Sequence, residues 1–396
     1  MVQNAAAPAR RLFLIGCLMM LYAPFGTLAF RFQAPAGYSE MRTLSAFPKW
    51  QTASALDWPV QFETWLDDHF PLRPQLIRLH AIIWHRIFEA PSNDVVVGRR
   101  GWLFYSGNRT LEDLVGRDKL TDAQLQQWLL GLEGRRAWLR DRGIGYLFVI
   151  EPNKSNIYPE MLPALLQAEI HPGKQDQLLA YLRKRGSSVP VLDLRPALLA
   201  SKAKELVYLR TDSHWNGAGL ACACDSVLNK LATLGCNASN RDLSPYLDMP
   251  PVPHTGDCLN LLGLAGAWPS PPEIVLRIRP TSGVSIVESP LSDTPPWRDM
   301  VSGGKPVFTE CRSGRGRLVL FSDSFFRSGG MPADVTAQSP FALMFQRQAN
   351  FFGLSNFAMM KAAVQSEHPD VVIDACSERF LSMWTPKDGA DYSRDR

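Results

Sequence analysis

The sequence has little net charge and no polybasic patch. Its 42 Lys and Arg residues nearly balance 38 Asp and Glu residues, leaving a formal net charge of +4. So small an excess gives no reason to expect a nucleic-acid partner. With 46% apolar and 20% charged residues, the 396-residue chain has an ordinary globular composition, which excludes a collagen, a coiled coil or a disordered chain. It lacks the repeated apolar runs of a polytopic membrane protein.

One long apolar run is present, near the N-terminus. Arg10 and Arg11 precede nineteen uncharged residues, 12–30. At about 1.5 Å per residue they span roughly 28 Å as a helix, close to the thickness of a hydrocarbon core. We predict a cytoplasmic stub and signal anchor over 1–30, with the chain after Phe30 in the periplasm. A cleaved signal peptide is the alternative, because small residues at 27–29 and 34–36 offer cleavage sites.

Cysteine is sparse and its spacing does not resemble a metal site. Cys17 lies in the apolar run, and Cys222-Ala-Cys224 is too tightly spaced for a zinc knuckle, with no histidine pair following at finger spacing. We therefore predict no metal site. The six cysteines beyond the run allow 15 pairings and leave disulfides and buried free thiols both open. They are Cys222, Cys224, Cys236, Cys258, Cys311 and Cys376.

Beyond a linker and N-terminal helical segment at 31–90, the pattern predicts one α/β domain over 91–396. A small hairpin at 94–98 and 102–105 precedes strands and helices that alternate. We expect strands at 146–150, 189–193, 316–321 and 371–373, and helices at 120–142, 176–185, 217–234 and 339–352. This alternation indicates a parallel sheet with helices on both faces and active groups at the carboxyl ends of its strands.

A proline-rich stretch interrupts the alternation at about 245–296. It holds eleven of the chain's 30 prolines, and only 273–278 has the pattern of a strand. Such a segment cannot supply a layer of helices. It is either an irregular surface insertion or a wall or lid beside a cleft, and we expect it to edge the active site because it lies between the two motifs described next.

Two short motifs carry residues suited to catalysis. Asp212 and His214 follow a strand-like stretch at 206–209, and side chains two residues apart point the same way on extended backbone. The carboxylate can then fix the imidazole tautomer that a general base needs. Ser324 follows the predicted strand 316–321, where its hydroxyl and nearby amides can face a reacting carbonyl. A serine there can equally cap a helix. No other histidine has a comparable setting.

Eight segments follow one another in the order of a known family. They are Glu40-Met-Arg42 with Phe47-Pro48, His69-Phe-Pro-Leu-Arg73, Val95-Val-Val-Gly98 with Gly101-Trp-Leu-Phe104, Pro152-Asn-Lys154 with Ile157-Tyr158-Pro159, Thr211-Asp212-Ser213-His214-Trp215, Gly256-Asp257 ahead of Leu261-Leu262-Gly263-Leu264, Ser322-Asp323-Ser324-Phe325, and Glu378-Arg379. With them the chain resembles the SGNH-hydrolase-like O-acetyltransferases of alginate and exopolysaccharide acetylation, especially the membrane-anchored member. The resemblance implies an SGNH-hydrolase-like, flavodoxin-like fold.

The resemblance also assigns roles to the motif residues. It implies Ser324 as nucleophile, His214 as general base and Asp212 as the residue that orients the base. Ser322 stands where the family motif has glycine, which puts the backbone geometry of that turn in question. Three residues are expected to line the acceptor site, because aromatic faces suit sugar rings and a lysine can pair with a uronate; core packing or a structural ion pair is the alternative for them. They are Lys154, Tyr158 and Trp215.

The function implied is a periplasmic O-acetyltransferase without a cofactor. An acetyl-serine intermediate would pass its acetyl group to a hydroxyl of an exported polysaccharide. The implied partners are that polysaccharide, the inner membrane and a membrane-bound O-acyltransferase that supplies the acetyl donor. The same triad would serve a polysaccharide deacetylase, and a non-catalytic scaffold of a secretion complex is the third alternative.

Overall fold

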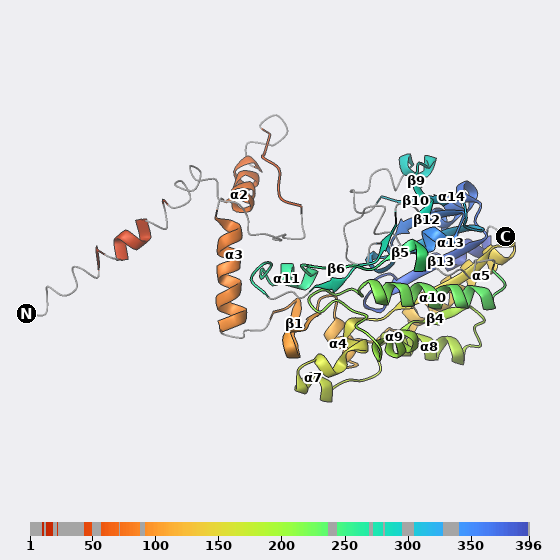
Figure 1. Ribbon diagram of the computed structural model, residues 1–396, viewed down its shortest axis with the longest axis horizontal. Coiled ribbons are helices and arrows are strands. Elements are labelled where there is room, and N and C mark those ends of the chain that lie inside the picture. Colours follow the sequence, from red (N-terminus) through yellow and green to blue (C-terminus); the bar gives the residue numbers. More distant parts are fainter. Residues whose placement is uncertain are drawn as a thin grey trace, which may run out of the picture. The chain divides into compact units, whose positions relative to one another are not determined.

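The computed structural model describes most of the chain beyond residue 92 and parts of the segment before it (Figure 1). The described residues are 10–11, 13–18, 22, 43–49, 57–70, 72–87, 92–236, 244–268, 272–279, 282–294, 305–327 and 340–394. The chain divides into two units, one of residues 1–92 with 259–269 and the other of residues 93–258 with 270–396. The second unit carries the predicted α/β domain.

A seven-stranded sheet forms the centre of the second unit, with strand order β4-β3-β13-β11-β12-β10-β9. The strands are β3 Gly145–Glu151, β4 Val191–Asp193, β9 Val284–Val287, β10 Val307–Cys311, β11 Arg317–Ser322, β12 Arg347–Phe352 and β13 Val371–Ser377. The first five strands in the spatial order are parallel, as the alternation predicts, and β10 and β9 add an antiparallel edge. The sheet is therefore mixed, not wholly parallel.

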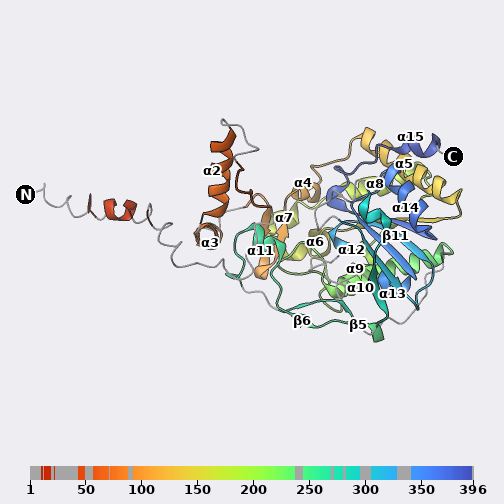
Figure 2. The same ribbon diagram turned by 90° about the horizontal axis from the view of Figure 1, so that it is seen from above.

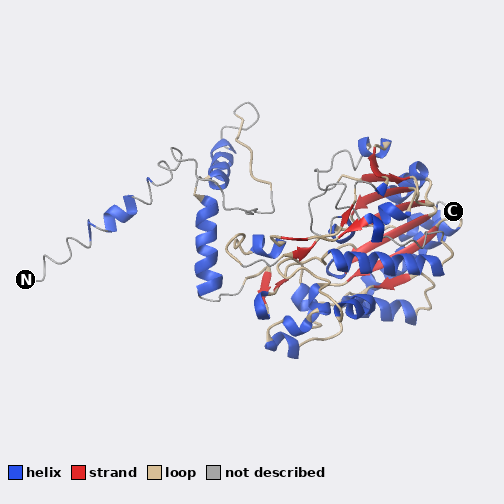
Figure 3. Ribbon diagram, viewed as in Figure 1, coloured by secondary structure: helices blue, strands red, loops and turns tan. Residues whose placement is uncertain are grey.

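Helices cover both faces of this sheet (Figures 2 and 3). On β3, Leu147 and Val149 point into one apolar core, whereas Phe148 and Ile150 point into the other. The first core is covered by α9 Arg195–Lys202, α10 Gly217–Thr233 and α13 Phe341–Met344, and the second by α5 Asp122–Arg140, α8 Lys174–Lys184, α14 Phe357–Glu367 and α15 Gly389–Arg394. Strands buried on both faces have near-continuous apolar sequences, which is why the central strands are predictable.

Short elements connect these layers. The predicted hairpin is present as β1 Val95–Val97 and β2 Leu103–Tyr105, an antiparallel pair. The short helices are α4 Thr110–Leu114, α6 Lys154–Ile157, α7 Ala164–Ala168 and α12 Ser324–Arg327. Helix α5 begins with a capping box formed by Thr121 and Gln124, and the chain leaves it through Gly143, whose φ is 73°. The predicted end of the 120–142 helix is thus correct to within a turn.

One prediction about this sheet is wrong, and one of its strands was not predicted. The stretch 339–352 is not one helix, because only 341–344 is helical and 347–352 is strand β12, buried between β11 and β10. Periodicity cannot separate a buried strand from a buried helix. Antiparallel β10 was also missed. Only residues 312–316 join it to β11, too few for the crossover that two parallel strands require.

The proline-rich stretch is largely irregular in its described parts. It pairs β5 Leu247–Asp248 with β8 Arg277–Ile278 and β6 Pro251–Val252 with β7 Glu273–Ile274, and it supplies edge strand β9. Its α11, Asp257–Leu261, has five residues. The predicted strand at 273–278 is thus two short strands. The short paired strands lie in the second unit and position residues 254–257, whereas residues 259–269 belong to the first unit.

The N-terminal unit contains α2 Asp57–His69, α3 Arg73–Ala81 and a π-helical turn, Ile82–Ile87. On α2, the rings of Trp58, Phe62, Trp65 and His69 stack in succession. Most of the apolar run at 12–30 lies outside the described residues. Among the described residues, none forms a helix with both the length and the hydropathy needed to span a bilayer.

All seven cysteines are free thiols in this structure. Four of the six beyond the apolar run, Cys224, Cys258, Cys311 and Cys376, are buried, and burial raises the pKa of Cys258 and Cys376 well above the usual thiol value. Of the two alternatives left open by the sequence, the structure has free thiols, with Cys222 and Cys236 only partly buried.

Candidate active site

The Asp-His motif lies in a tight turn. A single antiparallel bridge joins Tyr208 to Trp215, and the Leu209 amide donates to the His214 carbonyl at 3.1 Å. The stretch at 206–209 is therefore not a strand of the main sheet, and the two side chains do not meet along extended backbone as predicted. They meet because Asp212 Oδ1 accepts the backbone N–H of His214 at 3.0 Å, a turn that aspartate forms readily.

Ser324 is the first residue of α12, and only Asp323 separates it from the end of β11. The neighbouring Asp323 holds this turn, because its two carboxylate oxygens accept the amides of Phe325 at 2.9 Å and Ser377 at 3.1 Å. Asp323 thus performs the capping role that the sequence allowed for Ser324. The Ser324 side chain is partly exposed and its hydroxyl turns toward the Asp-His turn.

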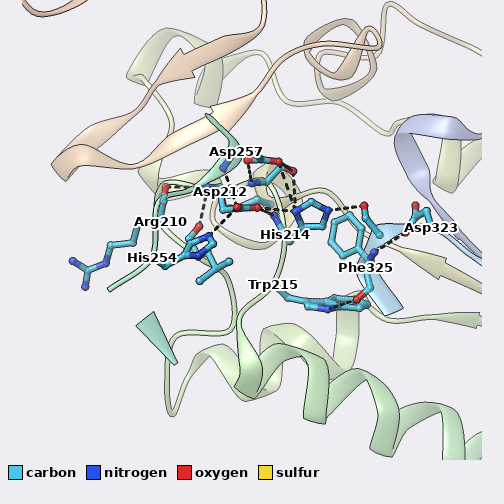
Figure 4. Close-up of polar contacts among 12 residues, drawn as sticks. Arg210, Asp212, His214, Trp215, His254, Asp257, Asp323 and Phe325 are labelled. Atoms are coloured by element: carbon cyan, nitrogen blue, oxygen red, sulfur yellow. Dashed lines mark hydrogen bonds and ion pairs between the residues drawn. The ribbon is translucent and has the colours of Figure 1, made fainter. Parts of the chain in front are cut away.

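Three side chains form one hydrogen-bonded line (Figure 4). His214 Nε2 lies 2.7 Å from Ser324 Oγ, and His214 Nδ1 lies 2.7 Å from Asp212 Oδ1. Asp212 accepts a hydrogen bond from the Nδ1–H group of His214. The other ring nitrogen, Nε2, then carries a lone pair that can accept the serine proton. The residues predicted from two motifs 110 positions apart are therefore in the geometry of a nucleophile, a general base and an orienting acid.

The electrostatics of this line follow from burial and hydrogen bonding. Burial by itself would raise the pKa of Asp212, but hydrogen bonds and charge interactions with His214 and His254 outweigh it and hold that pKa well below the usual value. Burial would lower the pKa of His214, but the Asp212 carboxylate and the charge of Asp257 raise it above 6.5. Asp212 is a fixed anion, and His214 is a stronger base than a free imidazole.

Two residues of the proline-rich stretch contact Asp212 and were not predicted as site residues. His254 Nε2 lies 3.0 Å from Asp212 Oδ2, and the Asp257 amide donates to the same oxygen at 2.9 Å (Figure 4). The expectation that no other histidine has a comparable setting is thus wrong for His254. The Gly256-Asp257 motif was the available signal. Gly256 is required there because a Cβ at this position would overlap the Thr211 carbonyl.

Asp257 also holds the turn from its other side. Its carboxylate accepts the Ser213 amide at 2.7 Å and the Ser213 hydroxyl at 2.5 Å, and one oxygen lies 3.6 Å from His214 Nδ1. Asp212, His214 and Asp257 together offer three metal-ligand atoms within 4.8 Å of one another. A metal there would have to displace the hydrogen bonds that join these atoms, so the arrangement fits proton transfer better than metal coordination.

The three residues expected to line the acceptor site are buried. Lys154 Nζ donates to the carbonyls of Leu209, Arg210 and Asp212 at 2.5–3.0 Å. These bonds hold the backbone of the Asp-His turn in place. Burial lowers the pKa of the lysine.

The two aromatic residues of this set are fixed by hydrogen bonds. Tyr158 is only 2% exposed, so its ring has no face open to solvent. Its hydroxyl accepts a hydrogen bond from the Val207 amide at 3.0 Å. Trp215 is fully buried, and its Nε1–H donates to the Phe325 carbonyl at 2.9 Å. That bond ties the Asp-His turn to the serine turn. Tyr158 and Trp215 are thus packed in the interior, and Lys154 is held by backbone carbonyls and not by an ion pair.

Ser322, in the place of the family's glycine, fits without disturbing the turn. It is fully buried at the end of β11, and its hydroxyl donates to Asn350 Oδ1 on β12 at 3.1 Å. Ser324, two residues later, keeps its 2.7 Å contact with His214. The Ser322 side chain is thus buried and hydrogen-bonded within the sheet.

With this geometry described, the similarity to known proteins can be stated. Residues 95–291 match the family model described as the SGNH hydrolase-like domain of the acetyltransferase AlgX. This stretch is an AlgX-like SGNH domain. The sequence-based resemblance is thereby confirmed, and so is the SGNH-hydrolase-like α/β fold. Asp212, His214, His254 and Asp257 lie inside the matched range, and Ser324 lies beyond it.

Named proteins are similar to parts of this chain. The probable alginate O-acetylase AlgJ of Pseudomonas aeruginosa is 30% identical over 158 residues, which cover 40% of this chain and 38% of that protein. The Azotobacter vinelandii protein of the same name is 26% identical over 203 residues, covering 51% and 50%. The chain therefore spans half or less of the length of these two relatives. The solved O-acetyltransferase domain of Pseudomonas putida AlgJ has 20% identity and a TM-score of 0.47, covering 76% of this chain and 99% of that domain.

Proposed function

We propose that this protein is an O-acetyltransferase that moves an acetyl group through Ser324 onto hydroxyls of an exported polysaccharide, with alginate as the model acceptor. The observation that carries the proposal is the hydrogen-bonded line from Asp212 through His214 to Ser324, with 2.7 Å at each step. The relatives named as probable alginate O-acetylases support acetyl as the transferred group and alginate as the acceptor class.

The first half-reaction acetylates the serine. His214 Nε2 takes the hydroxyl proton as Ser324 Oγ attacks the carbonyl carbon of the acetyl donor. Asp212 stabilises the imidazolium that results, and the Ser324 amide is the donor we assign to the developing oxyanion. When the tetrahedral intermediate collapses, the bond to the donor's leaving group breaks and that group takes the proton from His214. The enzyme is left as acetyl-Ser324 with a neutral imidazole.

The second half-reaction repeats these steps with the sugar. A hydroxyl of the polysaccharide gives its proton to His214 and attacks the acetyl carbonyl, and Ser324 Oγ leaves and regains the proton. Water in place of the sugar would give hydrolysis, so that acceptor positioning separates a transferase from a deacetylase. Because the base must be neutral and the pKa of His214 is raised above 6.5, activity should rise with pH through a range above that value.

Placement of the active domain in the periplasm, tethered by an anchor at 1–30, belongs to the same proposal. Its support is the membrane-length apolar run after Arg10 and Arg11. By resemblance to its family, the enzyme would receive acetyl groups from a membrane-bound O-acyltransferase at the inner membrane.

Substitution of the triad tests the chemistry. Ser324→Ala, His214→Ala and the double variant should each lose at least about 10³-fold in acetyl transfer from a chromogenic acetyl ester to an oligouronate, with no additivity, because the residues act as a unit. Ser187→Ala, which removes a half-buried hydroxyl before β4 that meets the Val189 amide, is the matched control and should retain its rate.

Three outcomes would contradict the proposal. A Ser324→Ala protein with ordinary activity would remove the serine from the mechanism. A wild-type protein that strips acetylated polymer but cannot acetylate an oligosaccharide supplied with donor would be a deacetylase. A wild-type protein without either activity, and with a Ser324 that resists acylating reagents, would be a scaffold.

A further inference from the structure

We propose that His254 is a positioning residue of the acetyl-transfer site, acting through Asp212 to set the basicity of His214. The inference rests on the proposed function and extends it to a residue outside the triad. It is built on the hydrogen bond between His254 Nε2 and Asp212 Oδ2, which adds a second histidine to the hydrogen-bonded line (Figure 4).

Asp212 has a full set of donors. An ionised carboxylate offers about four lone-pair sites. Oδ1 accepts the backbone N–H of His214 at 3.0 Å and its Nδ1–H at 2.7 Å, and Oδ2 accepts the Asp257 amide at 2.9 Å and His254 Nε2 at 3.0 Å. Two of these donors belong to the backbone and one to the base itself. His254 is therefore the donor in this set that can be replaced without altering the triad or the main chain.

The protonation of His254 Nε2 follows from this contact. Asp212 is ionised, so it can only accept, and Nε2 of His254 must carry the proton that points at Oδ2. The side chain is 10% exposed, and Gly256 permits the close approach of the following backbone to Thr211. The donor is thus held by the fold and does not depend on substrate.

Four charged or titratable groups act on His254 or on His214 at this contact. Asp212 is the hydrogen-bond partner of His254. Glu273, 5% exposed, accepts the Arg210 amide at 3.0 Å, and its charge interacts with that of His254. Asp257 lies beside His214, and the charge of Arg379 opposes that of an imidazolium at His214. Among these groups, His254 is the one that lies outside the Asp-His turn and donates to Asp212 from its side chain.

The consequence for catalysis has a definite sign. A donor on Oδ2 draws charge away from Oδ1, which weakens the pull of Asp212 on the imidazolium of His214. Without His254 the carboxylate becomes a stronger base and is free to rotate. The pKa of His214 should then rise further. In a plot of kcat/KM against pH, the rising part at low pH (the acid limb) should therefore move to higher pH. The loss of orientation should lower kcat, whereas KM for the acetyl donor should change little.

The test compares three substitutions at one position. Glutamine places its amide nitrogen near the place of Nε2, whereas asparagine reaches only to the place of Nδ1 and phenylalanine keeps the ring without a donor. We expect His254→Phe and His254→Asn to lose about tenfold in kcat, the size expected for one hydrogen bond to a charged group, with the acid limb at higher pH. His254→Gln should restore most of the rate and return the limb. Transfer is measured with a chromogenic acetyl ester and an oligouronate acceptor across pH 5–9.

A second readout does not depend on the acceptor. The rate at which a sulfonyl fluoride modifies Ser324 reports the fraction of neutral His214, and its pH midpoint should shift in the same direction. If His254→Phe fails to fold, the Gln and Asn pair still decides the matter. His171→Phe, at an exposed loop position of the same unit, controls for the loss of a histidine and should behave as wild type.

The outcomes separate this inference from the proposed function. A His254→Asn or His254→Phe protein with wild-type kcat and an unmoved acid limb overturns the role of His254 while Ser324→Ala remains inactive. A general loss of kcat without any shift of either pH midpoint, unrescued by glutamine, shows a structural role and also overturns it. If Ser324→Ala is active, the proposed function itself fails, whatever His254 does.

Discussion

The substitution Asp212→Asn tests the centre of the reasoning, because four donors converge on this carboxylate. An amide has only one oxygen, so its NH2 group must face two of the four. If NH2 takes the place of Oδ1, it meets the backbone N–H of His214 and forces the imidazole proton from Nδ1 to Nε2. The base then presents a proton to Ser324 and cannot accept one.

The other orientation of the amide also impairs the site. NH2 in the place of Oδ2 meets the Asp257 amide and His254 Nε2. His254 can change tautomer and accept, but the Asp257 N–H is left without a partner, at about 1–3 kcal/mol of stability. The correct His214 tautomer survives, yet the negative charge that stabilises its imidazolium is lost. The charge of Asp212 is one of the causes that raise the pKa of His214, so that pKa should fall in the variant.

We therefore expect Asp212→Asn to fold with lower stability and to lose up to about 10⁴-fold in kcat, the size of effect that this change has in serine-protease triads. Its acid limb should move to lower pH, opposite to the shift expected for His254→Phe. The assay is kcat/KM for a chromogenic acetyl ester from pH 5 to 9, beside thermal unfolding. Glu310→Gln, an exposed acid paired with Arg347, is the control. An Asp212→Asn protein with near-normal kcat and an unmoved limb would refute the assignment of the triad.

Two further predictions concern the docking of the proline-rich stretch and the topology of the chain. Gly256→Ala should lower both Tm and kcat, because its Cβ would overlap the Thr211 carbonyl and push Asp257 from Asp212. The control is Gly283→Ala, which has open space around its Cβ and a φ of 80° and should strain only its own turn. Equal rates in the two variants would contradict this prediction. A phosphatase reporter fused after residue 60 should be active and membrane-bound, since the apolar run follows Arg10 and Arg11. A soluble active reporter would mean cleavage, and an inactive one would reverse the topology.

The sequence alone predicts the elements whose patterns are local. The buried strand at 146–150 and the helix that Gly143 ends are visible as an apolar run and a 3.6-residue period, and both are present. Asp212, His214 and Ser324 could be chosen because two short motifs each place suitable groups beside a predicted element. Their order along the chain and the motifs around them also carry the family resemblance, since motif order is a property of sequence.

Other features were decided only by tertiary structure. Strand β12 has the composition of a buried helix, and its placement between β11 and β10 is a matter of long-range pairing. Lys154 and Trp215 have the chemistry of a sugar site, but whether they face solvent or the turn depends on contacts with residues 55 and 110 positions away. His254 lies in a proline-rich stretch without any periodic pattern. It reaches Asp212 because short paired strands and a glycine without a Cβ bring that backbone against the Asp-His turn, and a contact between segments 42 residues apart leaves no trace in local sequence.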